Sequence, residues 1–342
     1  MKDSGSRRLI WVDALKGWLM LLVVMGHAIQ WTLGDETDDS HVWNIIYSFH
    51  MPAFFAVSGW LAYRPGRQGK GPTIGHSHTA YLIVRRAQQL LIPFFCWSLV
   101  IILSRRLNFF SAMAGMIEKP DNSFWFLWAL FFIYLIFHVS VAVSRQLRCG
   151  ESAVILLVGA FLSALMVVFQ LNSFGFQFIA YYFLFFSLGY FIHKYPWLQI
   201  THKAWLAALF AVWVILAWWW RMHELPPWVS VFATSSWLQY AYRGVTATIA
   251  ILVLINVSPL LLDSDHWTNR RMGVVGAWSM GIYTVHLSIL TMLLHGIEQF
   301  IPKSYYVAFV CVLFFSALII SLALVYLIMK NKYTARLLMG KF

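Results

Sequence analysis

Long runs of apolar residues, separated by short polar stretches, dominate the pattern along this chain. A helix needs roughly 20 apolar residues to cross the hydrocarbon core of a bilayer. On that criterion the runs predict ten transmembrane helices, at residues 10–31, 43–63, 84–104, 124–144, 152–171, 174–193, 204–220, 237–262, 273–295 and 305–329. We therefore expect an all-α, polytopic membrane helix bundle. No repeat or insertion the size of a soluble domain interrupts it, which predicts a single domain over residues 1–342 without an appended soluble domain.

The composition supports a membrane protein. Of the 342 residues, 61% are hydrophobic and only 11% are charged, whereas soluble domains carry about 25% charged residues. The 18 Trp, 15 Tyr and 28 Phe suit membrane–water interfaces, where amphipathic rings collect. Cys96, Cys149 and Cys311 show neither a pairing pattern nor metal-ligand spacing, so no disulfide framework or zinc site is expected. No cleavage-like site follows the first apolar run, which argues against a cleavable signal peptide.

The net charge of +12 does not indicate a nucleic-acid partner, because the basic residues are spread over many loops and form no single patch. Their distribution instead predicts the membrane orientation, since cytoplasmic loops are enriched in Lys and Arg. With the N-terminus in the cytoplasm, most of the 25 basic residues fall inside: Lys2, Arg7, Arg8, Arg64, Arg67, Lys70, Arg85, Arg86, Arg145, Arg148, Lys194, Lys203, Arg270, Arg271, Lys330, Lys332, Arg336 and Lys341. The outside then holds Arg105, Arg106, Lys119, Arg221 and Lys303. An even number of spans returns the C-terminus to the cytoplasm.

The first predicted span carries titratable residues that a bilayer makes costly, by about 2.5–3.5 kcal/mol each on insertion scales. Lys16 and His27 are eleven residues apart, close to three helical turns, so they share a face and lie roughly 16 Å apart along the helix axis. Lys16 is then near the cytoplasmic edge, and His27 lies beyond mid-membrane. The alternative for Lys16 is that it reaches the cytoplasm and pairs with Asp13, three residues away.

The second span places His50 at a depth similar to that of His27. Pro52 frees backbone carbonyls, which suits a helix that lines a polar cavity. Ser58 and Gly59 allow a close helix approach. His50 is therefore a candidate for the site, and the alternative is an interhelical hydrogen bond that holds the bundle together.

Two later spans add candidates for substrate binding. Ser279, Tyr283 and His286 fall at positions i, i+4 and i+7, which makes one polar stripe; interhelical packing is the alternative. Arg243 lies inside the eighth span and needs a carboxylate, carbonyls or an anionic substrate. No acidic residue lies clearly within the outer half of any span, which favours the substrate.

Arg85 and Arg86 stand at the cytoplasmic end of the third span. Such pairs commonly reflect membrane orientation alone. They also fit phosphate groups, because the guanidinium fork matches phosphate geometry.

These residues belong to a series of motifs that is similar to a known family. Besides Lys16 and His27, the motifs are FHMPAFFAVSG at 49–59, LLIPFF at 90–95, WFLWALF at 125–131, FFSLGYFI at 185–192 and SMGIYTVH at 279–286. In this order and on ten spans, they resemble acyltransferase family 3 membrane proteins, especially the branch similar to fucose 4-O-acetylase. Each motif alone is weak apolar sequence, and it is the complete series over nearly the whole chain that carries the resemblance.

The resemblance implies an enzyme of the bacterial inner membrane. Its donor would be acyl-CoA, usually acetyl-CoA, and its acceptor a hydroxyl of a cell-surface polysaccharide or its lipid-linked sugar precursor. The essential histidine of the family falls on His27, and its basic partner falls on Lys16. A basic residue that the family has before LLIP is Gln89 here, and Arg86 lies one turn earlier on the same face. No metal is implied, and a homo-oligomer is compatible with the motifs.

An O-acyl transfer needs a base for the hydroxyl and stabilisation of the tetrahedral oxyanion. We expect His27 to be the base, with His50 or a nearby hydroxyl orienting it. Lys16, Arg85 and Arg86 would hold the phosphates of the coenzyme; Arg243, Tyr283 and His286 would contact the acceptor. Direct transfer is the simpler version, and a covalent acyl-His27 intermediate stays open.

Two other classes of function remain as alternatives at this stage. A transporter or flippase for a sugar or lipid-linked sugar also uses intramembrane His and Arg, although no inverted repeat is visible here. A structural or sensory membrane protein has little need for Lys16 and His27 on one helix face.

Overall fold

Every regular element in the described part of the chain is a helix. The computed structural model describes residues 9–63, 76–122, 124–231, 235–263 and 266–342. The predicted all-α, polytopic architecture is confirmed. Some basic residues on which the predicted orientation partly rests lie outside the described residues: Lys2, Arg7, Arg8, Arg64, Arg67 and Lys70.

Nine helical segments among the described residues are long and apolar enough to cross a membrane, and they match nine of the ten predicted spans. Their main helices are α1 (Ile10–Leu33), α3 (His50–Ala62), α4 (His76–Ser104), α6 (Trp125–Gln146), α7 (Glu151–Phe169), α8 (Phe176–Lys194), α11 (Ser236–Leu262), α13 (Ser279–Glu298) and α14 (Tyr306–Met329). Shorter elements lie between them or follow the last one: η1 (Gly34–Asp39), α2 (His41–Tyr47), α5 (Phe109–Glu118), η2 (Pro120–Asn122), η3 (Ser173–Gly175), η4 (Pro196–Leu198), α10 (Pro227–Ser230), α12 (Trp267–Ala277) and α15 (Lys332–Met339).

The span predicted at 204–220 is shorter than the others. It forms α9 (Lys203–Trp218), whose 16 residues rise by about 24 Å, less than the roughly 30 Å of a bilayer core. The guanidinium of Arg221 donates to the carbonyls of Trp218 and Trp220 at 3.3 and 2.9 Å, which satisfies the end of the helix where it stops.

Two spans that the sequence predicts as continuous are broken. The 43–63 span divides into α2 and α3 at Ser48 and Phe49. Pro52 has no backbone N–H to donate to the carbonyl of Ser48, four residues earlier. At the same break the Ser48 hydroxyl donates to the Ile45 carbonyl at 2.7 Å. The 273–295 span divides into α12 and α13 at Trp278, whose backbone is not helical. Apolar periodicity does not reveal such breaks, because the residues on both sides of each break are hydrophobic.

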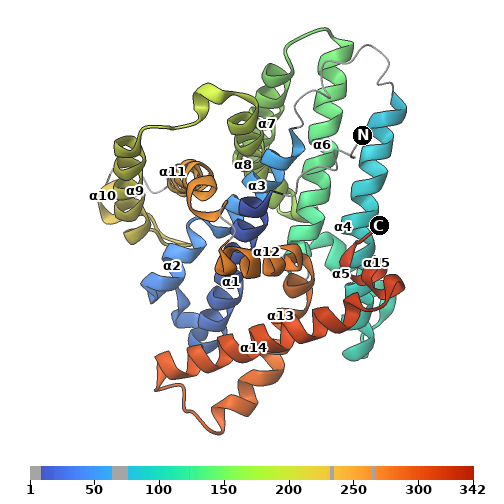
Figure 1. The fold of residues 1–342 in the computed structure, drawn as a ribbon, viewed down its shortest axis with the longest axis vertical. Helices are drawn as coiled ribbons and strands as arrows, with labels where there is room; N and C mark the ends of the chain where they lie inside the picture. The colour runs from blue at the N-terminus through green and yellow to red at the C-terminus, as the bar shows by residue number, and fades with distance from the viewer. Residues whose placement is uncertain (1–8, 64–75, 123, 232–234, 264–265) are drawn as a thin grey trace. The chain divides into compact units, whose positions relative to one another are not determined.

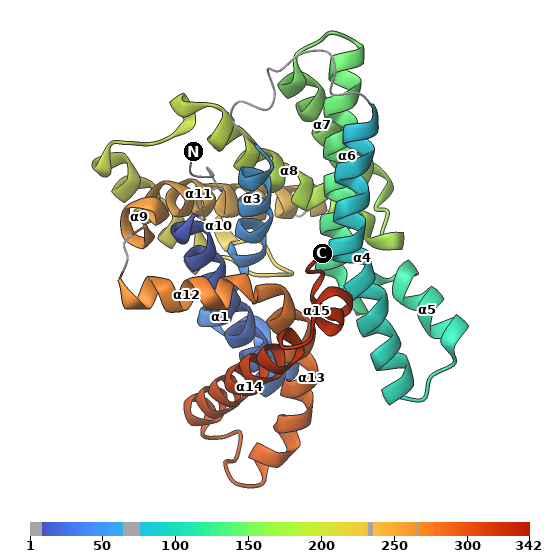
Figure 2. The ribbon, with the colours of Figure 1, turned by 45° about the vertical axis from the view of Figure 1, so that its right-hand side comes forward.

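The helices form two compact units. The first contains residues up to 57 together with 199–326, and the second contains 58–198 with 327–342. In the first unit α1 is the central element, packed against α2, α11, α12 and α13. Both ribbon views show α12 crossing α1 (Figures 1 and 2).

Glycines let α12 approach α1 at backbone distance. A Cβ atom on Gly276 would overlap the carbonyl oxygen of Asp13, and one on Gly17 would overlap the carbonyl oxygen of Met272. In the second unit, Gly59 does the same for α3 against the carbonyl of Phe186 on α8. The close approach predicted at Gly59 is thereby confirmed.

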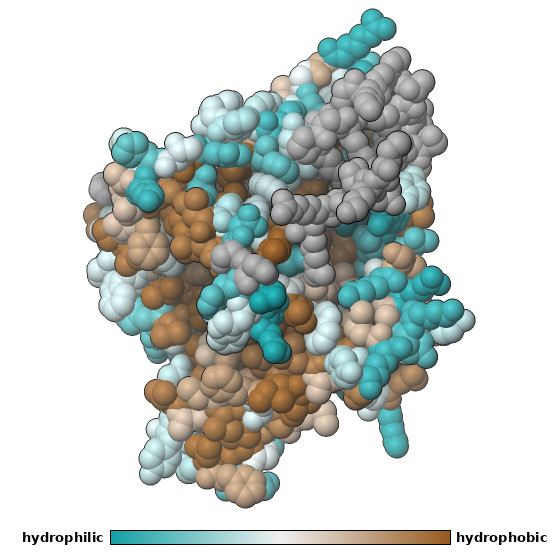
Figure 3. Space-filling view, in the orientation of Figure 1, coloured by the Kyte–Doolittle hydropathy of each residue, from teal (hydrophilic) through white to brown (hydrophobic). Residues whose placement is uncertain are grey.

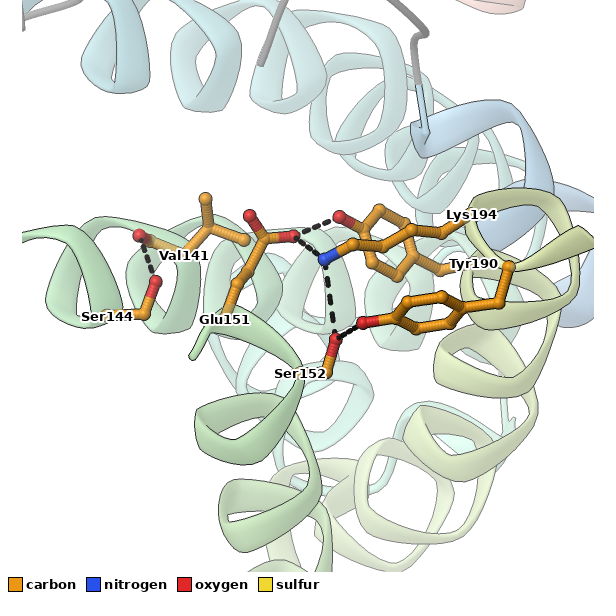
Figure 4. Close-up of polar contacts among 7 residues, drawn as sticks. Val141, Ser144, Glu151, Ser152, Tyr190 and Lys194 are labelled. Atoms are coloured by element: carbon orange, nitrogen blue, oxygen red, sulfur yellow. Dashed lines mark hydrogen bonds and ion pairs between the residues drawn. The ribbon is translucent and has the colours of Figure 1, made fainter. Parts of the chain in front are cut away.

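A polar network ties α7 to α8 in the second unit (Figure 4). The carboxylate of Glu151 accepts from the Tyr190 hydroxyl and from Lys194 Nζ, the latter at 3.3 Å. Lys194 also donates to Ser152 Oγ at 3.3 Å, and Ser152 lies 2.6 Å from the Tyr195 hydroxyl. Glu151 begins α7, where a negative charge interacts favourably with the helix dipole. The network joins the start of α7 to the end of α8, which are the ends opposite the short segment that connects the two helices.

The surface matches a membrane environment. Hydrophobic side chains gather over α14 in the space-filling view (Figure 3). On this helix Phe315 and Ile319 expose 57% and 63% of their surface. Such exposure is costly in water and favourable in lipid.

α15 contacts α4 within the second unit, where Trp97 donates to the Leu338 carbonyl at 3.0 Å.

Candidate active site around His27

The imidazole of His27 is held by two polar side chains. Its Nδ1 lies 3.1 Å from Gln30 Oε1 and 3.4 Å from the Tyr47 hydroxyl, and that hydroxyl donates to the same Oε1 at 3.1 Å. An amide oxygen only accepts hydrogen bonds. Nδ1 of the neutral ring therefore carries the hydrogen, and Nε2 keeps its lone pair. This is the tautomer that a general base needs.

A glycine makes room for this contact. Gly26 precedes His27 on α1, and a Cβ atom there would lie 2.8 Å from Cε2 of the Tyr47 ring. α2 ends at Tyr47, at the break before α3. The break in the second span and the missing side chain at Gly26 together bring the Tyr47 hydroxyl to His27.

His50 supports Tyr47. It is 3% exposed, and its Nδ1 donates to the carbonyl of Ile46 at 2.8 Å. Its ring meets the Tyr47 ring edge-on, with centroids 4.7 Å apart. The described contacts of His50 thus reach His27 by way of Tyr47.

His286 is the nearest second imidazole to His27 among the described contacts. The two ring centroids are 5.2 Å apart, and His286 is fully buried. Its Nδ1 donates to the Ile282 carbonyl at 2.9 Å, while Nε2 has no hydrogen-bond partner within the described residues. Tyr283 lies beside it, at 6.0 Å between centroids. His27, His50 and His286 therefore all present Nε2 as the basic nitrogen.

Only one of the three imidazoles is accessible. His27 is half-buried and Gln30 is exposed, whereas His50 and His286 are buried. A substrate that reaches this cluster therefore meets His27 first. The structure brings together His27, His50, Tyr283 and His286 out of the predicted set.

Lys16 lies on the same continuous helix as His27, as predicted. Its Nζ is 2.9 Å from the carboxylate of Asp13, and the two side chains are 25% and 15% exposed. The ion pair that the sequence left as an alternative is thus present. It leaves the local charge balanced.

The other predicted residues have separate surroundings. Arg243 on α11 is half-buried, with its guanidinium carbon 5.5 Å from the Trp220 ring centroid and 5.9 Å from that of Tyr240. Arg85 and Arg86 belong to the second unit. Arg85 is exposed. Arg86 lies over the Tyr134 ring at 4.2 Å and donates to Gln89 Oε1 at 3.0 Å. Its guanidinium therefore lies beside Gln89, the position where the resemblance predicts a basic residue.

Sequence reasoning missed Gln30 and Tyr47. Gln30 follows His27 by three residues, so helical spacing alone was a usable signal for it. Tyr47 had none, because its approach depends on the helix break and on Gly26.

Residues 9–326 match the family model described as an acyltransferase domain. The chain belongs to this acyltransferase family. The match spans the His27 cluster and nearly all of both units. The apolar helices make the chain a multi-pass membrane member of this family.

Two relatives are similar over part of their length. The chain is 30% identical over 228 residues to the nodulation protein NolL of Sinorhizobium fredii, covering 62% of this chain and 57% of that protein. It is 30% identical over 142 residues to the nodulation protein NolL of Mesorhizobium japonicum, covering 39% of this chain and 36% of that protein. The chain thus spans little more than half of the first relative and about a third of the second. No solved structure matches.

Proposed function

We propose that this acyltransferase moves an acetyl group from acetyl-CoA to a hydroxyl of a cell-surface polysaccharide or of its lipid-linked sugar precursor. The observation that supports this most directly is the His27 cluster: an accessible imidazole, fixed through Nδ1, with a basic Nε2 inside an apolar bundle. Positioned bases of this kind typically contribute 10²–10⁴-fold to proton-transfer steps.

In the proposed mechanism, His27 Nε2 takes the proton of the acceptor hydroxyl as its oxygen attacks the thioester carbonyl carbon. The tetrahedral oxyanion collapses, the carbon–sulfur bond breaks, and the coenzyme leaves as a thiolate. That thiolate receives the proton held by His27, which restores the base. Gln30 and Tyr47 keep the ring in the reactive tautomer, and His50 holds Tyr47.

Within the first unit, Lys16 is assigned to a phosphate of the coenzyme, and Arg243, Tyr283 and His286 are assigned to the acceptor. The assignment of Arg85 and Arg86, which belong to the second unit, to the phosphates stays a prediction from the sequence. Arg86 is the better placed arginine for a fixed contact, since Tyr134 and Gln89 hold its guanidinium. His286 adjoins His27 and Tyr283 adjoins His286, which suits contacts with the reacting sugar ring.

A transfer assay tests the proposed function. The purified protein is reconstituted in liposomes and supplied with acetyl-CoA labelled in the acetyl group and with a panel of methyl glycosides, including methyl fucoside. We expect label on the saccharide and free coenzyme in equal amounts. Movement of unmodified saccharide across the liposome membrane, with no label on it, would instead indicate a transporter.

Lys16 gives a prediction that separates binding from stability. Lys16→Gln removes the cation, and Asp13→Asn keeps the cation and removes its partner. If Lys16 contacts the coenzyme, Lys16→Gln raises the KM for acetyl-CoA by at least about tenfold, the lower end of what one charged hydrogen bond contributes, and Asp13→Asn does not raise it. Steady-state kinetics with both variants measure this. Equal loss of thermal stability with an unchanged KM would show that the ion pair is only structural.

We also propose the bacterial inner membrane as the location, with both termini in the cytoplasm and a single transmembrane domain. Nine long helices would put the termini on opposite sides, so this orientation requires the 16-residue α9 to cross as a tenth span. A fluorescent protein fused after Phe342 is expected to fluoresce in intact bacteria, because the fusion folds in the cytoplasm. A dark fusion whose chain is intact and exported would place the C-terminus outside.

A further inference from the structure

The chain ends in a short helix, α15, that is turned out of the last long helix. α14 has 24 residues, more than the roughly 20 that cross a bilayer core, and α15 begins three residues after α14 ends. The turn between them is fixed by two side chains. That of Asn331 accepts from the Tyr333 N–H at 2.8 Å, and the Thr334 hydroxyl donates to the Ile328 carbonyl at 2.7 Å. α15 therefore starts where α14 leaves the hydrocarbon, at a membrane surface.

The other end of α15 is docked on α4, as both ribbon views show (Figures 1 and 2). Gly340 caps α15 with φ 60° and packs against the carbonyl of Gln89, where a Cβ atom would overlap the carbonyl oxygen. Pro93, four residues after Gln89 in α4, has no N–H to donate to that carbonyl, which leaves room for Gly340. Trp97 holds the neighbouring turn by donating to the Leu338 carbonyl. α15 is thus held in one orientation.

Two faces of α15 are apolar, and only one of them packs on the protein. Ala335 and Met339, four positions apart, are buried. Tyr333 and Leu337, also four positions apart, expose 62% and 49% of their surface. Residues four apart share a face of a helix, so the second pair forms an outward-facing apolar stripe. Such a stripe is unfavourable in water and suits a membrane interface, where aromatic residues also collect.

The flank between these two faces is basic. It carries Lys332 and Arg336, which are exposed, and an exposed Lys341 follows the helix. With Lys330 just before α15, four cations lie within residues 330–341, and the chain has no Asp or Glu after Glu298. α4, on which α15 packs, carries no acidic residue either. Clusters of four or more Lys and Arg beside a membrane span or on an amphipathic helix are typical of anionic lipid binding.

We propose that α15 is an interfacial helix that binds anionic phospholipids. Its cations hold headgroup phosphates, while Tyr333, Leu337 and Phe342, which is 45% exposed, enter the apolar layer beneath. Amphipathic helices with basic and aromatic residues lie in the membrane interface in this way. A soluble phosphate compound would account for the cations but not for the exposed apolar side chains beside them. This role is separate from acyl transfer, so it can be tested without an activity assay.

Removing the cations of α15 tests the proposal. The α15 variant combines three substitutions: Lys332→Gln, Arg336→Gln and Lys341→Gln. The control variant removes three exposed cations elsewhere in the same unit: Arg105→Gln, Arg106→Gln and Lys119→Gln. Both variants lose the same net charge, so they differ in where that charge was.

Each purified protein, in an uncharged detergent, is titrated with labelled phosphatidylglycerol, which is anionic, and with labelled phosphatidylcholine, which has no net charge. A cation near an anionic lipid surface contributes about fivefold to affinity. We therefore expect the α15 variant to raise the Kd for phosphatidylglycerol by at least about tenfold. The control variant should keep the wild-type Kd, and the Kd for phosphatidylcholine should be alike in all three proteins. Melting temperatures show whether each variant is folded.

An unchanged Kd for phosphatidylglycerol in the α15 variant would overturn the proposal. Displacement of the bound lipid by acetyl-CoA or by glycerol phosphate would also overturn it, because the ligand would then be a soluble phosphate compound. If the combined variant does not fold, the three single variants decide, each expected to weaken phosphatidylglycerol binding about fivefold. Wild-type binding in all three would refute the role of α15 equally.

Discussion

Changing His27 to asparagine is expected to reduce acetyl transfer by at least about 100-fold and by as much as about 10⁴-fold, the range that a positioned base contributes. The asparagine amide can still donate to Gln30 Oε1 from the position of Nδ1, so the contacts that hold α1 and α2 together survive. The basic Nε2 is lost. His27→Ala removes both and should be as inactive, while the protein remains folded and inserted in the membrane. Transfer of labelled acetyl measures the effect.

The control for this experiment is His138→Asn. His138 is another half-buried imidazole, carried by the long apolar helix α6 in the second unit. The His138→Asn variant should retain near wild-type transfer, because losing an imidazole outside the His27 cluster does not remove the base. Wild-type rates in His27→Asn, or equal losses in both variants, would end the assignment of His27 as base.

The positions of the long helices were readable from the sequence because a bilayer imposes one simple length rule. The predicted span at 10–31 became α1 at Ile10–Leu33, and that at 305–329 became α14 at Tyr306–Met329. His27 could also be singled out from the sequence as a candidate, since a titratable group inside a predicted span has few structural explanations. These inferences depend on the amount and spacing of apolar residues, which the sequence states directly.

What surrounds His27 was not readable, because it depends on how helices bend and how closely they meet. The Tyr47 hydroxyl arrives through a helix break at Ser48 and Phe49, inside an unbroken apolar run. His286 was predicted from the stripe with Tyr283, but its closeness to His27 requires α12 and α13 to change direction at Trp278. Period and hydropathy do not encode either bend.

The tautomer of the three imidazoles could not be predicted from the sequence either. All three imidazoles of the cluster are fixed through Nδ1, two of them by a carbonyl four residues earlier on the same chain segment. For His27 the partner is a side chain, Gln30, that also serves Tyr47. The orientation of His27, the accessible histidine, therefore depends on polar side chains. Substitution of Gln30 or Tyr47 can disturb it.

The close packing of α1 and α12 gives the second large expected effect. Gly276→Ala adds one methyl group, which would overlap the carbonyl oxygen of Asp13 on α1 and lie 2.8 Å from the backbone nitrogen of Gly17. Backbone atoms cannot rotate away, so the helices must separate. Overpacking of this kind typically costs about 1–3 kcal/mol and occasionally more. We expect a lower melting temperature in detergent.

Activity should fall further than stability in this variant, because α1 carries His27 and α12 leads directly into the helix that carries His286. Separating α1 from α12 moves one imidazole relative to the other. The control is Gly273→Ala on the same helix, where the new methyl would meet only the Asp13 Cβ at 4.0 Å, an ordinary contact. Alanine is a better helix former than glycine by about 1 kcal/mol, so Gly273→Ala should keep or raise the melting temperature. If the two substitutions have the same effect on melting temperature and on transfer, close approach at Gly276 is not what holds the two imidazoles in place.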